Sequence, residues 1–535
     1  MEFPLIGGSL VDTAVVAVYI VFLISVAWLV SREKGGRQKN TQDYFLAGHG
    51  LPWWAVGASL IAANISAEQI IGMSGSGYAI GLAIASYEWM AAITLIIVGK
   101  YFLPVFISRR IYTMPQFLQQ RYDHRVKTIL AVFWLGVYVF VNLTAILWLG
   151  ALTIHTIAGV ELVYGMVFLV ALALAYSLYG GLKAVALTDV IQVVLLIFGG
   201  LVLSWIALDL IGEGRGVATG FNVLLERAPE KFDMILSRDN PHYASLPGIS
   251  VLVGGMWVMN LSYWGFNQYI IQRALAAKDL REGQKGIVFA AYLKLLMPLI
   301  VVLPGIAAVV LLPDLARADQ AYPALMNLMP AGLKGLIFAA LIAAIVSSLG
   351  SMVNSIATIF TMDLYAHRHP SHSEAHYVTI GRIAGLVALL LAAVCARPLL
   401  GNFDQAFQYI QEFTGFFTPG IVVLCLLGIF WPLATANGAL VAAVSSAALS
   451  LVLKFTWPEL PFIDRVGLVF LCCLALAVIT SLLQSSAKEN PAAHTPAPIK
   501  GSDASWEAGF ATDQTFNLAG LGVVLLLVAL YATWW

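Results

Sequence analysis

Two charged residues stand alone inside long apolar stretches of the sequence. Glu88 lies in the otherwise uncharged stretch 81–98, and Lys294 lies in the stretch 287–312. Such residues usually have a use, because a charge at the bilayer centre costs about 2.5–3.5 kcal/mol on insertion scales. The depths of Glu88 and Lys294 along their two helices predict that a gap of about 10 Å separates the two residues near the middle of a membrane. One small polar molecule would fit between this acceptor and this donor; a buried ion pair that only holds helices together is the alternative.

Amide side chains occur in similar apolar surroundings. Amides both donate and accept hydrogen bonds, as a sugar hydroxyl does, so amides beside one Glu and one Lys match a neutral polyol. An amino acid is the alternative, with Glu88 binding its amine. Tyr263 and Trp264 could cover one face of a sugar ring, and Tyr87 and Phe407 the other, although each aromatic alone fits ordinary helix packing. The amides are Asn64, Gln69, Asn260 and Gln411.

Two adjacent hydroxyls mark a candidate cation site. Ser347 and Ser348 lie in the middle of an apolar stretch, and sodium takes oxygen ligands that include backbone carbonyls. The two hydroxyls could join the carbonyl oxygens of Ala62, Ile65 and Ala344. Serines in membrane helices often bond back to their own turn, so spacing alone leaves both interpretations open.

The composition predicts a protein embedded in a membrane. Of the 535 residues, 60% are hydrophobic and 11% are charged, against about 25% charged residues in soluble domains. The net charge is zero, so nothing suggests a nucleic-acid partner, and no obligate protein partner is evident. Apolar runs long enough to cross a bilayer predict an all-α, polytopic fold with about fourteen membrane helices. The predicted spans are 10–31, 52–79, 80–108, 126–153, 160–180, 186–211, 247–272, 286–312, 332–363, 378–397, 406–430, 436–455, 465–484 and 515–535.

Basic residues in alternate loops predict the orientation. The loops after the first, third and seventh spans are basic, which puts them inside and both termini outside. The segment Thr113–Tyr122 predicts a short interfacial helix, and the polar segment 486–512 predicts an inside loop. Four histidines of another inside loop either bind a metal ion or are simply solvated: His367, His369, His372 and His376.

Polar residues and glycines interrupt two of the predicted spans. Spans 52–79 and 247–272 combine amides, serines and glycines, as a helix broken within a membrane requires; a packing seam of small residues is the alternative. Each opens a set of five spans, and an odd number of spans inverts a repeat. We therefore expect an N-terminal helix and basic loop (1–51), inverted repeats at 52–211 and 247–430 separated by an outside loop (212–246), and peripheral helices (431–535).

Several longer motifs are specific enough to compare with known families. They are Asp43–Gly48, Pro52–Gly77, Tyr87–Trp89, Tyr179–Leu182, Thr188–Gln192, Tyr263–Gln268, Ile345–Ser348 and Gln408–Glu412. On these motifs the chain resembles the sodium/solute symporter family, and within it the bacterial sodium/galactose type. The resemblance covers nearly the whole chain and is weakest in the loops 212–240, 313–331 and 366–376.

The resemblance implies a LeuT-like core and sodium-coupled uptake of a hexose, galactose or glucose, by alternating access through a bacterial inner membrane. Sodium symport of another small polar solute, such as inositol or an amino acid, is the alternative. Tyr263, next to Trp264, is similar to an inner gate, and Met73, Tyr87 and Phe407 are similar to an outer gate. The resemblance assigns sugar binding to Asn64, Gln69, Glu88, Asn260, Lys294 and Gln411, sodium binding to Ala62, Ile65, Ala344, Ser347 and Ser348, and sodium exit to Asp189.

Two positions depart from the pattern of the family. Ala91 stands where the bacterial sodium/galactose type has a serine that contacts the sugar, a hydrogen bond worth about 0.5–1.5 kcal/mol. Ser262 replaces a tyrosine next to the inner gate. Membrane lipid and a sugar are the expected partners, and the preferred hexose stays open. The spans contain no zinc motif and no Ser/His pair that would indicate an enzyme. The alternative to a transporter is therefore a channel or a solute sensor.

Overall fold

A bundle of helices makes up the computed structural model, which describes residues 9–31, 50–109, 111, 113–401, 405–485, 510 and 512–535. The side chains of 23–24, 26–31, 176–189 and 485 lie outside this description. The described chain has no β-strand, only an isolated bridge between Leu51 and Ala277. Nine helical segments in it are long and apolar enough to cross a membrane, or eleven if each bent pair is one span. A helical membrane fold is therefore confirmed, and the count of fourteen stays a prediction.

In the first predicted repeat, spans 80–108 and 126–153 match helical segments at Leu82–Ser108 and His124–Ala158, because the apolar runs have the length that a bilayer requires. Spans 160–180 and 186–211 were predicted as two helices but lie in one continuous helix, α10 (Leu162–Ile211). The parts of α10 with described side chains are Leu162–Ala175 and Val190–Ile211. The helices up to this point are α1 (Leu10–Ser31), α3 (Trp53–Asn64), α4 (Met73–Ala79), α5 (Ser86–Ile97), α6 (Leu103–Ser108), α7 (Met114–Arg121), α8 (His124–Val137), α9 (Thr144–Ala158) and α10 (Leu162–Ile211). α7 confirms the short helix predicted at Thr113–Tyr122.

The second predicted repeat begins after a long connection that carries α11 (Val217–Arg227). Within this repeat α18 is the central helix, because 94% of the most apolar 18-residue stretch of the segment Leu333–Arg368 is buried. The helices of this repeat are α12 (Ser250–Val253), α13 (Gly255–Leu261), α14 (Gln268–Leu275), α15 (Leu280–Met297), α16 (Leu303–Leu311), α17 (Ala321–Met326), α18 (Leu333–Thr358), α19 (Ala366–Arg368), α20 (Glu374–Leu400), α21 (Ala406–Thr414) and α22 (Thr418–Phe430).

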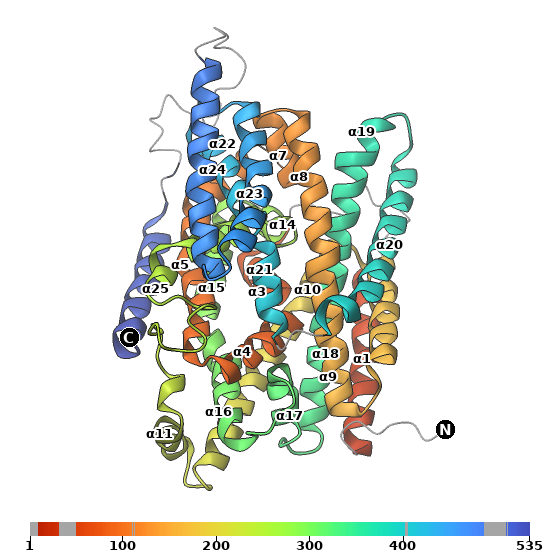
Figure 1. Ribbon diagram of the computed structural model, residues 1–535. Helices are drawn as coiled ribbons and strands as arrows, with labels where there is room; N and C mark the ends of the chain where they lie inside the picture. Colours follow the sequence, from red (N-terminus) through yellow and green to blue (C-terminus); the bar gives the residue numbers. More distant parts are fainter. Residues whose placement is uncertain are drawn as a thin grey trace.

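Three further helices lie at the periphery of the bundle: α23 (Ala436–Thr456), α24 (Phe462–Ser485) and α25 (Gln514–Thr533). Only 22% of the most apolar 18-residue stretch of α25 is buried, so most of the surface of this helix is left to contact lipid. In Figure 1, α25 lies at the left edge of the bundle, against α5 and α15, and α23 and α24 lie side by side in its upper part.

Both ends of the described chain contact loops at the same end of the bundle, the lower end in Figure 1, where α11, α16 and α17 also lie. Near the N-terminus, Asp12 is buried and accepts hydrogen bonds from the amides of Gly332 (2.7 Å) and Gly335 (2.8 Å). Near the C-terminus, the carbonyl of Trp534 accepts from the amide of Met234 (2.9 Å). This agrees with termini on one side of the membrane; that this side is the outside stays a prediction.

The opposite end carries α7, whose Arg121 closes the short connection after α22. Its guanidinium donates to the carbonyls of Gly428 (2.9 Å), Trp431 (2.8 Å) and Ala434 (3.2 Å). The connection 431–435 has no charge of its own, so the basic residue at this end comes from a neighbouring loop. Burial lowers the pKa of Arg121 from its usual value, but the carbonyls that surround it suit a cation.

Candidate solute and cation site

The first interrupted helix turns sharply in the middle of the bundle. α3 ends at Asn64, and the chain bends by 60° before continuing through the π-helical turn Glu68–Gly72 into α4. Ile65 leaves the helical conformation with ψ of 75°. The hydroxyl of Ser66 accepts a hydrogen bond from the amide of Glu68 (3.2 Å) and so caps the second half. A π-helical turn beside such a break is frequent at functional sites.

The second interrupted helix breaks at Asn267. The π-helical turn Ser262–Phe266 follows α13, Asn267 is extended (φ −80°, ψ 120°), and α14 then begins. The hydroxyl of Tyr138 donates to the side chain of Asn267 (2.5 Å) and accepts from the amide of Gln268 (3.0 Å). A side chain from a neighbouring helix thus satisfies the freed backbone, as a membrane interior requires. Both spans predicted to be interrupted are interrupted.

A third bend was not predicted. α21 and α22 meet at 48° around residues 415–417, inside the span 406–430 that the sequence suggested was continuous. Pro419 near the start of α22 suits the first turn of a new helix. The bend places α21 across the bundle, with Phe407 and Gln411 facing the cavity described next.

A cavity of about 70 Å³ lies between the interrupted helices. The predicted solute-binding side chains reach it from α3, α5, α13, α15, α21 and the π-helical turn after the first break, so it joins segments that are far apart in the sequence. All six line it: Asn64, Gln69, Glu88, Asn260, Lys294 and Gln411. Their role in binding a solute stays a prediction.

Glu88 and Lys294 contact each other directly, so the predicted gap of about 10 Å between them is wrong. The Lys294 ammonium lies 2.6 Å from Glu88 Oε2, and both side chains are at most 2% exposed. Lys294 also donates to Asn64 Oδ1, and Gln69 Nε2 donates to Glu88 Oε1. The prediction estimated the depth of the backbone along each helix. The long side chains of Glu88 and Lys294 reach toward each other and span the gap between the two backbones. The cavity is small because this ion pair crosses it.

The predicted gate residues lie on two sides of the cavity. On one side, the rings of Tyr87 and Phe407 meet edge to face with centroids 5.1 Å apart. Met73 does not line the cavity; it is buried behind Gln69, whose Nε2 lies 3.8 Å from its sulfur. The other side holds two further predicted gate residues, Tyr263 and Trp264.

Tyr263 is fixed in place by its hydroxyl. This hydroxyl accepts from Asn64 Nδ2 (3.0 Å) and shares a hydrogen bond with Tyr269 (2.6 Å). The ring of Trp264 lies against the Tyr263 ring (5.1 Å) and 4.9 Å from the Lys294 ammonium, within the range of a cation–π interaction. Aromatic side chains therefore close the cavity on both sides.

The candidate cation site combines backbone oxygens with a buried hydroxyl. The amides of Ser66 and Gln69 donate to the carbonyls of Asn64 (2.8 Å) and Ser66 (3.1 Å). In an unbroken helix the amide of Ser66 would instead bond the Ala62 carbonyl, and the amide of Gln69 would bond the Ile65 carbonyl, each four residues earlier.

The hydroxyls come from α18, which packs against α3. Ser347, Ser348 and Ala344 are buried there, and the Ser348 hydroxyl has no hydrogen-bond partner. A buried polar atom without a partner calls for an explanation such as an ion. Neutral oxygens of this kind fit a hard monovalent cation. The side chain of Asp189, the predicted sodium-exit residue, lies outside the described residues.

The cavity also contains residues that the sequence did not assign to the site. Glu68 and Asn267 had been noted only as polar residues of the interrupted helices. A lone amide inside an apolar span is a signal that would have found Asn142. The unassigned lining residues are Glu68, Asn142, Met259, Asn267, Ile410 and Thr414.

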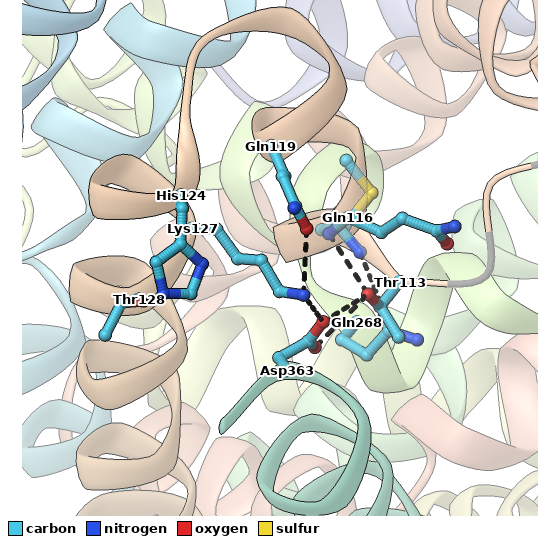
Figure 2. A network of polar contacts seen from close by, with 9 residues as sticks. Thr113, Gln116, Gln119, His124, Lys127, Thr128, Gln268 and Asp363 are labelled. Carbon is cyan, nitrogen blue, oxygen red and sulfur yellow. Dashed lines mark hydrogen bonds and ion pairs between the residues drawn. The ribbon is translucent and has the colours of Figure 1, made fainter. Parts of the chain in front are cut away.

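A buried polar network joins the ends of four helices on the side of the bundle that carries α7 (Figure 2). Lys127 of α8 reaches both Asp363 Oδ1 (3.1 Å), beyond the end of α18, and Gln119 of α7 (3.0 Å). Thr113 caps α7 and donates to Asp363 (3.2 Å). The Met114 amide, next to this cap, donates to Gln268 of α14 (2.8 Å). α7 is thereby tied both to the long helices α8 and α18 and to the half-helix that follows the second break.

The histidine cluster lies beyond this network. His372 and His376 stack with centroids 4.2 Å apart, and His376 bonds the Tyr365 hydroxyl (2.9 Å). His367, His369 and His372 are exposed. Within the described ranges, no three His, Cys, Asp or Glu side chains are placed to hold a metal ion.

A core of two interrupted helices around a central cavity is the fold of a class of solved transporters. A sodium-coupled sialic acid symporter, in a substrate-bound outward-open state, aligns with a TM-score of 0.77 and 24% identity over 89% of this chain and 98% of its own. A nucleobase-cation-symport-1 family transporter in a closed conformation aligns with a TM-score of 0.51 and 15% identity over 83% of this chain and 96% of its own. At these identities the likeness shows the fold alone.

Sequence comparison identifies the family. The model of the sodium:solute symporter family matches residues 44–445. The chain is 52% identical to a sodium/glucose cotransporter of Vibrio parahaemolyticus over 99% of each chain. It is 34% identical to the mouse sodium/myo-inositol cotransporter 2 over 84% of this chain and 71% of the relative. This chain therefore belongs to the sodium:solute symporter family and is a multi-pass membrane transporter coupled to sodium.

Proposed function

We propose that this protein carries a hexose, galactose or glucose, into the cell together with sodium by alternating access, and that it is a transporter without enzymatic activity. The observation that carries the proposal is the cavity between the interrupted helices. It gathers an ion pair, six amides and aromatic rings from segments spread along the chain. The 52% identity to a sodium/glucose cotransporter supports the same solute class.

A sugar would bind by replacing contacts that the cavity residues now make with each other. Glu88 offers acceptors and Lys294 offers donors, and their mutual contact at 2.6 Å would give way to contacts with hydroxyl groups. The amides of Asn64, Gln69, Asn260 and Gln411 donate and accept, which suits hydroxyls that also do both. The face of Tyr263 would pack on the apolar face of the ring.

Sodium would bind beside the break in the first helix. The proposed ligands are the carbonyls of Ala62, Ile65 and Ala344 and the hydroxyls of Ser347 and Ser348, and Asp189 would assist release. The ion would hold α3 against α18 and favour the form that is open to the outside. Met73, Tyr87 and Phe407 would close the outer path over the sugar, and Tyr263 would move aside for release inward.

The energy available is sufficient for accumulation. One charge that crosses 100 mV yields about 2.3 kcal/mol, and a tenfold sodium gradient yields about 1.4 kcal/mol. With one sodium ion per sugar, about 3.7 kcal/mol could hold about a 500-fold sugar gradient.

The test is uptake into reconstituted vesicles with and without an inward sodium gradient, using labelled galactose, glucose, myo-inositol and alanine. We expect gradient-driven accumulation of a hexose. Equal uptake without the gradient would indicate a channel or a sensor instead.

Ser348→Ala tests the sodium site, and we expect it to abolish the sodium dependence of uptake. The matched control is Ser446→Ala, which removes a buried hydroxyl that bonds the Phe416 carbonyl (2.8 Å) and accepts from the Gly420 amide (3.0 Å), away from the cavity. Unchanged sodium-driven uptake in the Ser348 variant would refute the assigned site.

A second candidate solute is myo-inositol, because several relatives at 34% identity are sodium/myo-inositol cotransporters. Inositol is also a ring of hydroxyls, and the cavity has Ala91 where the bacterial sodium/galactose type has a serine. Competition of labelled galactose uptake by inositol separates the two solutes. Stronger competition by inositol than by unlabelled galactose would assign the protein to polyol transport.

A further inference from the structure

A second carboxylate, that of Glu68, faces the cavity without a basic partner. Glu68 is the first residue of the π-helical turn after the break, is 7% exposed and lines the cavity. Its carboxylate accepts one long hydrogen bond, from Asn142 Nδ2 (3.4 Å). Throughout the described ranges, no Lys, Arg or His forms an ion pair with it. This contrasts with Glu88, whose two oxygens contact Lys294 and Gln69.

The cavity therefore has an excess of negative charge. Two carboxylates, Glu68 and Glu88, share it with a single ammonium, Lys294, and Lys294 is engaged by Glu88 at 2.6 Å. A carboxylate away from water that lacks a compensating cation costs several kcal/mol, so such a group tends to be neutralised. Water in an open cavity could hydrate Glu68; a solute that displaces this water removes that solvation.

Neighbouring elements do not supply the missing positive charge. Glu412 on α21 is itself the acid partner of Lys454 (2.7 Å) and Arg465 (3.2 Å). On the turn before α17, Asp319 accepts from the Ala406 amide (2.9 Å). Arg317, just before this turn, donates to the Gly401 carbonyl (2.9 Å) and lies 5.6 Å from the centre of the Trp148 ring. The remaining ionisable residues on the packed elements and across the cavity are the imidazole of His155, bonded to the Val160 carbonyl, and the phenols of Tyr78, Tyr87, Tyr138, Tyr263, Tyr269, Tyr322 and Tyr409.

We propose that Glu68 is a proton-binding site coupled to the solute. When a solute enters and displaces water, the Glu68 carboxylate takes one proton from bulk water. The neutral carboxyl then donates its hydrogen to a solute hydroxyl or to the Asn142 carbonyl oxygen. One proton would thus bind in the same cavity as the solute, separate from the sodium site. This inference rests on the proposed solute class.

The test measures protons directly. Purified full-length protein in saturating sodium and weakly buffered solution receives galactose, and a pH-indicator dye reports protons taken up per galactose bound. We expect uptake that approaches one proton per galactose toward higher pH. By linkage, galactose affinity falls up to about tenfold per pH unit over the same range.

Glu68→Gln keeps the size and hydrogen-bonding of the side chain and removes its titration. We expect this variant to bind galactose with an affinity independent of pH and without proton uptake. Glu412→Gln, at a carboxylate that already has cationic partners, is the matched control and should behave as wild type.

Two results would overturn the proposal: galactose binding to wild type without proton uptake, and proton uptake that persists in Glu68→Gln. The first needs only the wild-type protein, so the test survives a variant that fails to fold. Absence of galactose binding to wild type would instead count against the proposed solute.

Discussion

At the scale of single residues, the buried pair of Glu88 and Lys294 has one observed role and one proposed role, and the two compete. In the closed cavity it neutralises two charges and joins α5 to α15. To bind a sugar, the same two groups must exchange their mutual contact for contacts with hydroxyls. The sequence presented these functions as alternatives; the direct contact shows the ion pair, and binding of a solute by the same groups stays a proposal.

The first prediction concerns the stability of this pair. Lys294→Met should lower the free energy of unfolding by about 3–5 kcal/mol, because it leaves a buried carboxylate without its cation. The double variant Lys294→Met/Glu88→Gln should recover most of this loss but not transport. Thermal unfolding in detergent measures the first effect, and vesicle uptake measures the second.

Arg281→Met is the control for this prediction. Arg281 pairs with Asp513 at 3.3 Å, and its side chain is 69% exposed, so the loss should stay below about 1 kcal/mol. If Lys294→Met unfolded no earlier than Arg281→Met, the buried pair would not be a stabilising contact.

At the scale of elements, the outer side of the cavity depends on the close approach of α4 to the turn before α17. A Cβ atom at Gly75 would lie 2.6 Å from Asp319 Oδ1 and 2.9 Å from its amide nitrogen. Asp319 in turn accepts the first amide of α21 (2.9 Å), the helix that carries Phe407. A glycine on α4 thus permits the contact that positions α21 and the proposed gate residue Phe407.

We predict that Gly75→Ala impairs closure of the outer path, because overpacking at such a contact costs about 1–3 kcal/mol. Uptake should fall while sodium-dependent sugar binding persists. The control is Gly136→Ala, because nothing lies within 4 Å of a Cβ added there. Full transport by the Gly75 variant would show that this contact is not needed for closure.

At the scale of the whole molecule, both ends of the described chain contact loops at one end of the bundle and α7 lies at the other. We propose a bacterial inner membrane with both termini outside, consistent with the basic loops at the end that carries α7.

Reporter fusions test this orientation. Alkaline phosphatase fused after Trp535 should be active, and green fluorescent protein fused after Ser485, before the predicted inside loop, should fluoresce. Activity of phosphatase at Ser485 and fluorescence at Trp535 would reverse the assignment.

The sequence by itself determined where several long membrane helices lie and that two spans are interrupted. The expected ranges 286–312 and 332–363 match helical segments at Leu280–Leu311 and Leu333–Arg368, because the length and polarity of a membrane helix are set by the local run of residues. Glycines and amides within spans 52–79 and 247–272 are also local signals, and both breaks are present.

Only the tertiary structure decided which side chains meet. The contact of Glu88 with Lys294, the bend between α21 and α22, and the place of Glu68 and Asn142 at one cavity all depend on how helices pack. Depth in a membrane can be estimated along one helix, but side-chain reach and helix tilt are set by neighbours distant in the chain. A local pattern therefore places a residue on its helix, and packing decides what it contacts.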